Sequence, residues 1–246
     1  MFTDKTVIIS GAASGMGLLS ARSFAERNAN VVLADMNIEA AGEAAAQIRE
    51  RGGRAAALAV DVRDYAQVKS AVDYAIQNFG GLDIIVNCAG GSARRILGQY
   101  DAFADLDIGV IDWALDVNLK GPVYFARAGI GHMIKQKSGV IINIGSVEGE
   151  TGSTNIEYCT AKSGVMYGLT KSLALYGAPY GVRVCCVSPG PVLTRPAMAK
   201  MRTALGRAAQ PGEIVDLILY LCSDKAAFIT GVNYLIDGGR SCGARD

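Results

Sequence analysis

The sequence predicts an α/β protein with a doubly wound, mostly parallel sheet and helices on both faces. Short β-branched apolar runs alternate with segments of helical periodicity along the chain. The expected strands are apolar throughout, which suits a parallel sheet that is covered on both sides. The chain has only six prolines and no Pro- or Ser-rich linker, so its 246 residues are expected to form one domain, residues 1–246.

The first half of the chain carries four expected strands and three expected helices. A helix follows each of the first three strands after a short turn, as in right-handed βαβ units. The strands are expected at residues 6–9, 30–34, 54–60 and 82–87. The helices are expected at residues 16–27, 38–51 and 65–79, and the second of them is alanine-rich and closed by Gly52 and Gly53.

The second half continues the same alternation. Helices are expected at residues 110–133, 158–176 and 211–222, and strands at residues 140–144, 182–187 and 232–236. Pro211 suits the first turn of its helix, where no N–H is needed. Helical spacing predicts a buried stripe of Ile214, Leu217, Ile218 and Leu221 on that helix.

Composition excludes several function classes. Apolar residues make up 50% of the chain, charged residues 19%, and the net charge of +1 gives no electrostatic case for nucleic acid or a membrane surface. The N-terminus carries Asp4 and no long apolar region, so no signal peptide is expected. Six cysteines and the single histidine, His132, show no metal-ligand spacing. We expect a cytoplasmic protein with reduced thiols, no membrane span and no metal.

A glycine-rich turn, residues 10–17, joins the first expected strand to the first helix. Gly11, Gly15 and Gly17 allow the backbone to approach a ligand closely. The helix N-terminus beyond them presents unpaired N–H groups, which suit a pyrophosphate. The strand–turn–helix context supports a dinucleotide site, which the glycines alone would indicate only weakly.

Asp35 closes the second expected strand, 18 residues after Gly17. A carboxylate there can accept hydrogen bonds from the adenosine ribose hydroxyls and would repel a 2′-phosphate. No basic residue stands at Ser14, Met36 or Asn37 to offset that repulsion, so NAD is favoured over NADP. The alternative is an ordinary acid at a strand end.

Two further strand ends carry polar or small residues. Asp61 and Val62 close the third strand, where an acid can bond the adenine amine. The fourth strand ends in Asn87-Cys88-Ala89-Gly90, and small residues at this sheet edge suit a cofactor that passes over them.

Tyr158 and Lys162 lie four residues apart at the start of an expected helix, and therefore on one face of it. A free tyrosine has a pKa of about 10, and lowering this pKa to about 7 needs roughly 4 kcal/mol of phenolate stabilisation. A neighbouring ammonium acts in that direction. Ser146, after the apolar run 140–144, is placed to donate a hydrogen bond to the same substrate oxygen. A surface tyrosine with a solvated lysine is the alternative for this motif alone.

With these motifs in place, the chain resembles the short-chain dehydrogenase/reductase family from Lys5 to about Gly239. Each motif is modest, but their order and spacing are jointly specific. The resemblance implies a Rossmann sheet of seven strands and hydride transfer between a nicotinamide and an alcohol or ketone. The motifs are residues 10–17, Asp61, Asn87-Cys88-Ala89-Gly90, Asn118, Ser146, Tyr158-x-x-x-Lys162 and Ser188-Pro189-Gly190.

The resemblance also implies residue roles. Tyr158 would be the acid/base, and Ser146 would polarise the substrate oxygen. Lys162 would lower the tyrosine pKa and hold the nicotinamide ribose, while Asn118 would kink its helix and position a water. The expected cofactor contacts are Gly11, Ser14, Gly15, Met16, Gly17, Asp35, Met36, Asp61, Val62, Asn87, Ala89, Gly90, Tyr158, Lys162, Pro189, Gly190, Val192 and Thr194.

Three positions depart from the family pattern. Cys88 stands where a second asparagine is usual, and Ser10 replaces a threonine but keeps the hydroxyl. Only about ten residues separate Thr194 from Leu205, where relatives commonly carry a longer helical lid. A short lid covers less of the substrate, so an open site is expected.

The sequence says little about the identity of the substrate. Arg94 and Arg95 follow the fourth strand and would either clamp an anionic substrate or lie in a solvated loop. Glu148 and Glu157 flank the tyrosine motif and would either bond substrate hydroxyls or lie exposed in turns.

These observations predict an oxidoreductase that transfers a hydride between NAD(H) and a secondary alcohol or ketone, such as a sugar, polyol or steroid. A 3-oxoacyl-thioester reductase acting on acyl carrier protein or CoA substrates is the alternative within the family. A nucleotide-sensing protein without activity is the alternative on the same fold. The resemblance implies a homotetramer, or else a homodimer.

Overall fold

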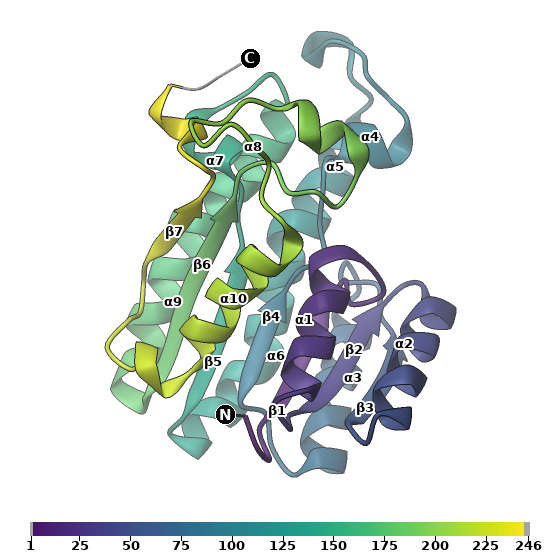
Figure 1. Ribbon diagram of the computed structural model, residues 1–246, viewed down its shortest axis with the longest axis vertical. Helices are drawn as coiled ribbons and strands as arrows, with labels where there is room; N and C mark the ends of the chain where they lie inside the picture. Colours follow the sequence, from purple (N-terminus) through teal and green to yellow (C-terminus); the bar gives the residue numbers. More distant parts are fainter. Residues whose placement is uncertain (1, 244–246) are drawn as a thin grey trace.

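Seven parallel strands form one sheet in the computed structural model, which describes residues 2–243 (Figure 1). The strand order is β3-β2-β1-β4-β5-β6-β7, so the predicted doubly wound α/β fold is confirmed. After β3 the chain returns to the other side of β1, which makes the β1–β4 boundary the switch point of the sheet. The strands are β1 Thr6–Ser10, β2 Asn30–Asp35, β3 Arg54–Ala59, β4 Ile84–Asn87, β5 Gly139–Ile144, β6 Val182–Pro189 and β7 Asn233–Ile236.

Ten α-helices lie in the described residues, with π-helical turns and short 3-10 segments between some of them. The helices are α1 Gly15–Ala25, α2 Ile38–Glu50, α3 Tyr65–Phe79, α4 Ala93–Leu97, α5 Ile108–Leu115, α6 Gly121–Gln136, α7 Val147–Thr151, α8 Ile156–Ser163, α9 Thr170–Gly177 and α10 Pro211–Cys222. The π-helical turns are Asp116–Lys120 and Gly164–Leu169. The 3-10 segments are Phe103–Asp105, Ala178–Tyr180, Pro196–Lys200, Asp224–Ala226 and Arg240–Cys242.

Side chains that alternate along each strand fill two apolar cores, one on each face of the sheet. On β1, Val7 and Ile9 pack against α1, α2 and α10, whereas Ile8 packs on the opposite face against α3 and α6. Both layers are visible in Figure 1. Because the strands are buried on both sides, they carry apolar residues at successive positions, as the sequence predicted.

Several helix ends follow local signals in the sequence. Asp64 caps α3, where its carboxylate accepts from the N–H groups of Ala66 and Gln67. Pro211 stands at the first turn of α10, and Glu213 completes a capping box with Gln210. The predicted stripe on α10 needs one correction, because Leu217 is only partly buried, whereas the adjacent Val215 and Leu219 belong to the core.

The two long helices predicted around residues 110–133 and 158–176 are each interrupted by a π-helical turn. The first turn contains Asn118, and the second directly follows the α8 segment that carries Tyr158 and Lys162. An i→i+5 turn inserts one extra residue and redirects the side chains near it. The resemblance had implied a kink at Asn118, where the first turn lies, whereas no sequence signal had placed the second turn.

Every strand ends at the same edge of the sheet because all seven are parallel. This edge lies in the upper part of Figure 1, where α4, α7 and α8 stand above the strands. Among residues 2–243, none of the helices combines the length and the apolar character that a membrane crossing requires.

Candidate active site

A cleft of about 440 Å³ opens above the carboxyl ends of β4, β5 and β6. It brings together most residues that the sequence placed around a nicotinamide. The predicted residues in its wall are Met16, Gly90, Ser146, Tyr158, Lys162, Pro189, Gly190, Val192 and Thr194. The sheet edge therefore carries one site, built from elements that are far apart in the sequence.

The glycine-rich turn is packed so closely that side chains would not fit. A Cβ on Gly11 would lie 2.8 Å from the Ala89 backbone, and a Cβ on Gly17 would lie 2.1 Å from the Gly11 carbonyl oxygen. Gly11 also has a φ of +68°, which favours glycine. The Ser10 hydroxyl accepts from the Ala89 N–H at 3.2 Å, which joins the ends of β1 and β4.

The N-terminus of α1 faces this edge, and its own first turn carries no acidic residue. Ser14, at the N-cap, makes no side-chain capping bond, and no acidic residue occupies the first turn. The N–H groups and the positive end of the helix dipole therefore remain available to an anion. Together with the tight glycine turn, these features fit the pyrophosphate of a dinucleotide cofactor.

Asp35 is held in place by two backbone hydrogen bonds. One carboxylate oxygen accepts from the Ala13 N–H and the other from the Asn37 N–H, both at 2.9 Å. The carboxylate thus ties the end of β2 to the glycine-rich turn and keeps lone pairs free for ribose hydroxyls. The neighbouring Met36 is 65% exposed, so its side chain has room over an adenosine.

Asp61 and Val62 lie at the end of β3 but differ in their surroundings. Both oxygens of Asp61 accept from the Arg63 guanidinium, at 2.6 to 3.0 Å, and this hydrogen bonding lowers the pKa of Asp61. Val62 is buried and would contact a Cβ on Gly121. Asp61 is therefore fixed by Arg63, a partner that the sequence analysis did not identify.

Asn118 is fully buried in the π-helical turn, and its side chain bonds to the helical turn before it and to the segment after β4. Its amide donates to the Ala114 and Gly91 carbonyls at 3.0 Å, and its oxygen accepts from the Gly91 N–H at 2.9 Å. A Cβ on Gly90 would lie 2.6 Å from the Asn118 oxygen and 3.3 Å from the Lys162 Nζ. A glycine at position 90 therefore lets Asn118 and Lys162 meet at the end of β4.

Lys162 is 4% exposed, and the described residues offer its ammonium no carboxylate in an ion pair. Nζ donates to the Ile144 carbonyl at 2.8 Å, at the end of β5, and lies 5.7 Å from the ring centroid of Tyr158. Burial lowers the pKa of Lys162 to about 8, because the charged form loses its hydration.

The phenol of Tyr158 differs from the sequence expectation. Burial raises the pKa of Tyr158 to about 12, while a hydrogen bond with Ser146 acts in the opposite direction. The charges of Glu148 and Arg195 have smaller, opposing effects. Nζ of Lys162 donates to the Ile144 carbonyl, and burial is the largest effect on the pKa of Tyr158.

Asn87 belongs to a buried chain of hydrogen-bonded side chains that the sequence motifs did not reveal. Its amide donates to the Asn143 oxygen at 2.9 Å, and Asn143 donates to the Thr170 hydroxyl at 3.0 Å. Thr170 in turn donates to the Val165 carbonyl at 2.7 Å, inside the second π-helical turn. Asn143, a polar residue within an apolar strand, was the available signal.

The segment after β6 forms one wall of the cleft despite its shortness. Gly190 packs against Asp237, and Val192 is buried and pairs with Ala209 through an isolated β-bridge. Thr194 is exposed above Gly15, whose Cβ would lie 3.8 Å from its methyl group. The same segment contributes three side chains that were not predicted, Arg195, Met198 and Met201. Tyr100 and Asn155, from other segments, also line the cleft without having been predicted.

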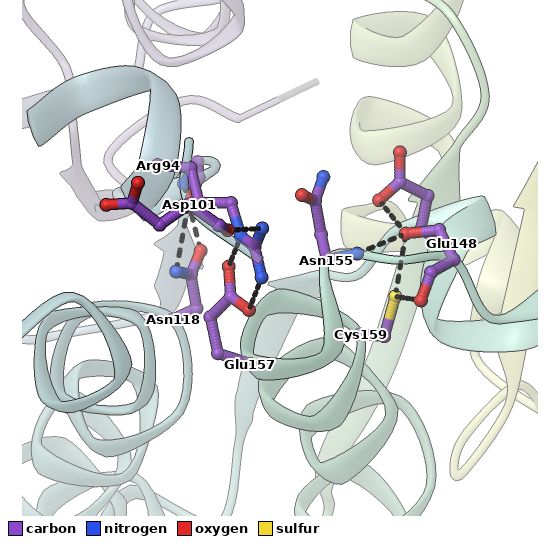
Figure 2. Close-up of polar contacts among 9 residues, drawn as sticks. Arg94, Asp101, Asn118, Glu148, Asn155, Glu157 and Cys159 are labelled. Atoms are coloured by element: carbon purple, nitrogen blue, oxygen red, sulfur yellow. Dashed lines mark hydrogen bonds and ion pairs between the residues drawn. The ribbon is translucent and has the colours of Figure 1, made fainter. Parts of the chain in front are cut away.

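Arg94 and Glu157 fit neither of the alternatives that the sequence left open for them. Neither lies in a solvated loop, and neither lines the cleft; they pair with each other, as Figure 2 shows. The Arg94 side chain is 10% exposed and that of Glu157 is completely buried. Both residues are therefore removed from the candidate substrate contacts, whereas Arg95 and Glu148 do line the cleft.

The cysteines in the described part of the chain are free thiols. The six cysteines are free, and burial raises the pKa of Cys88 to about 12, which keeps this cleft residue a thiol. Among residues 2–243, no cluster of three metal-ligating side chains occurs.

The chain is similar in sequence to one family model and to several curated dehydrogenases. A family model described as enoyl-(acyl carrier protein) reductase matches residues 11–241. Cyclohexanol dehydrogenase from Acinetobacter sp. (strain SE19) is 36% identical, over 96% of this chain and 95% of its own. Trans-4-hydroxycyclohexanecarboxylate dehydrogenase from Sinomonas cyclohexanicum is 40% identical, over 98% and 94% of the two chains. Meso-2,3-butanediol dehydrogenase from Serratia marcescens is 34% identical, over 97% and 95%.

Replacing Lys162 with methionine should change how stability depends on pH. The pKa of about 8 lies below the ordinary value of 10.5, so between these pH values the unfolded chain binds more protons than the folded protein. Wild-type stability therefore carries the full cost of the buried charge below pH 8 and recovers as the pH rises toward 10.5. The difference in pKa corresponds to roughly 3 kcal/mol.

We expect the free energy of unfolding of Lys162→Met, relative to wild type, to fall by an amount of that order between pH 7 and pH 10 in urea denaturation. The lost bond to Ile144 adds an offset that hardly varies with pH. Lys69→Met, at an exposed ion pair on α3, serves as the control and should show no such trend. A difference for Lys162→Met that is independent of pH would contradict the buried-charge assignment.

Proposed function

The chain belongs to the short-chain dehydrogenase/reductase family, and we propose that it transfers a hydride between NAD(H) and a secondary alcohol or its ketone, with Tyr158 as acid/base. The observation that carries this proposal is the convergence of Ser146, Tyr158 and Lys162 in one cleft beside the glycine-rich turn. A protein that only sensed nucleotides would not need this combination of phenol, hydroxyl and buried ammonium.

The chain's own groups account for the proton transfer. In ketone reduction, the Tyr158 phenol donates its proton to the substrate oxygen, and the Ser146 hydroxyl donates a hydrogen bond to the same oxygen. In alcohol oxidation, the phenolate accepts the hydroxyl proton. A bound nicotinamide would donate the hydride in ketone reduction and accept it in alcohol oxidation. The raised pKa of Tyr158 keeps the proton available for reduction at neutral pH.

Lys162 acts on Tyr158 through its charge. Its ammonium lies 5.7 Å from the phenol ring, in a site with little water, where a cation favours the phenolate over the phenol. Because the ammonium and the phenol ring are neighbours in one pocket, we expect the charge of Lys162 and the proton on Tyr158 to be coupled. Any kinetic pKa therefore belongs to the pair. The proposed catalytic set is Asn118, Ser146, Tyr158 and Lys162.

The choice of NAD over NADP is proposed on the position of Asp35. Its carboxylate is fixed by the Ala13 and Asn37 N–H groups at the end of β2, where an adenosine ribose would lie. A 2′-phosphate there would meet a like charge, and Met36 offers no compensating cation.

The substrate is proposed to be a small hydroxy compound. The relatives compared above are named for cyclohexanol, a hydroxycyclohexanecarboxylate and a butanediol. The cleft offers methionine side chains for an apolar ring and the charged groups of Arg95, Arg195 and Glu148 for polar substituents. A 3-oxoacyl-thioester reductase is not favoured, because these relatives are all named as dehydrogenases of hydroxy compounds.

We also propose a cytoplasmic location and assembly as a homotetramer or homodimer. Free cysteines support a reducing compartment. Exposed apolar side chains on α9, Leu175 and Tyr176, and the fully exposed Phe228 support burial against another copy. Analytical ultracentrifugation of the purified protein measures the assembly directly.

Exchanging Asp35 for serine together with Met36 for arginine should shift preference toward NADP. The first change removes the repelling carboxylate, and the second supplies a cation for the 2′-phosphate. Wild type should show a much higher kcat/KM with NAD than with NADP, measured by nicotinamide absorbance on a panel of cyclic and acyclic alcohols. Equal efficiency with both cofactors in the wild type would refute the role of Asp35.

Replacing Tyr158 with phenylalanine should reduce turnover at least 10²-fold while leaving NAD binding nearly intact. The ring and its packing remain, and only the hydroxyl that exchanges the proton is lost. Tyr65→Phe, on α3 beside Tyr124, is the matched control and should keep normal turnover. Near-normal turnover by Tyr158→Phe would remove the acid/base assignment and favour the nucleotide-sensing alternative.

A further inference from the structure

A buried ion pair joins α4 to the residue that precedes Tyr158. Arg94 Nε donates to one oxygen of Glu157 at 2.9 Å, and Nη2 donates to the other at 3.2 Å. The third interaction of the guanidinium runs from Nη1 to the Asp101 carbonyl at 2.8 Å. Figure 2 shows the fork of Arg94 facing the carboxylate on α8. One side chain thus connects three separate places in the chain.

The burial of this ion pair bears on whether the pair serves stability or geometry. The Glu157 side chain is completely inaccessible to water and that of Arg94 nearly so. Removing two charges from water is costly, and a buried pair adds little net stability compared with apolar residues of similar volume. A bidentate guanidinium–carboxylate contact does, however, fix relative position and angle more strictly than apolar packing does.

The segment held by Arg94 forms one wall of the cleft. At its start, Gly91 is bonded to Asn118 through both its N–H and its carbonyl. Farther along, Ser92, Arg95 and Tyr100 line the cleft, while Arg94 points away from it into the pair with Glu157. A second part of the cleft wall includes Tyr158 of α8 and Asn155, the residue before this helix. Arg94 and Glu157 therefore connect the two walls behind the cleft surface.

We propose that Arg94 and Glu157 are positioning residues that set the distance between the 91–106 segment and Tyr158, and with it the fit of the substrate. Neither residue contacts the substrate. Glu157 acts on Tyr158 as its immediate neighbour on α8, and Arg94 acts on Arg95 and Tyr100 through its own backbone and through Asp101. Because this role concerns the reaction at Tyr158, it rests on the proposed function.

Conservative variants test the role. Glu157→Gln keeps the shape of the side chain but removes the charge, and Arg94→Lys keeps a cation but loses the planar fork. We expect each to raise the KM for the alcohol at least tenfold and to lower kcat by a smaller factor. The Kd of NAD, measured by calorimetry, should stay within twofold of wild type, because the glycine-rich turn and Asp35 do not touch the pair.

A double variant carrying both changes tests whether the residues act as one unit. Its loss of kcat/KM should be close to that of the worse single variant rather than the product of the two losses. Asp73→Asn, which breaks the exposed Lys69–Asp73 pair on α3 by the same carboxylate-to-amide change, is the matched control and should leave the KM unchanged. Multiplicative losses, or an alcohol KM within twofold of wild type in both single variants, would overturn the proposal.

Hydrogen–deuterium exchange gives a readout that does not depend on activity. In both single variants, amides of residues 91–106 should exchange faster than in wild type, while those of α3 should not change. If the wild type oxidises no alcohol but the exchange result appears, the proposed function fails and the connection between the walls stands. If the wild type is active and exchange in residues 91–106 is unchanged in the variants, the positioning role is wrong.

Discussion

The buried ammonium of Lys162 is the constraint on which the rest of the site depends. A cation that is 4% exposed and lacks a carboxylate partner among the described residues is stable only where backbone dipoles face it. The Ile144 carbonyl, at the end of β5, provides such a dipole, and Gly90 leaves the space that Nζ occupies. The sheet therefore ends in a pocket that tolerates a charge, and Tyr158 shares this pocket from the same face of α8.

The surrounding elements keep this arrangement in place through polar contacts rather than packing alone. The π-helical turn Asp116–Lys120 directs Asn118 at Gly91, and the Asn87–Asn143–Thr170 chain links β4 and β5 to the second π-helical turn. Both turns belong to the helices next to the cleft, where irregular hydrogen bonding is often found at functional sites. The Arg94–Glu157 pair adds a polar contact between α4 and α8 behind the cleft. Each contact leaves a buried polar group unpaired if one partner is removed.

Local patterns predicted the fold well, because strands and helices depend on neighbouring residues, whereas the predicted cofactor contacts stay a prediction. Continuous apolar runs predicted the buried strands, and Pro211 marked the start of α10. The pairing of Arg94 with Glu157, 63 residues later, could not be inferred in this way. A charged residue in a loop and one in a turn look alike whether they are solvated or paired. The same holds for the pKa of Tyr158, because burial depends on elements that the motif does not contain.

The pH dependence of the reaction in its two directions tests most directly whether Tyr158 exchanges the proton. Alcohol oxidation needs the phenolate, so its kcat/KM should rise with pH, whereas ketone reduction needs the phenol, so its kcat/KM should fall over the same range. With the nicotinamide saturating, the alcohol profile reports the complex with the oxidised cofactor and the ketone profile reports the complex with the reduced cofactor. Each profile therefore has its own apparent pKa, which belongs to the coupled pair of Tyr158 and Lys162. Profiles that run in the same direction, or that do not depend on pH, would contradict proton exchange by Tyr158.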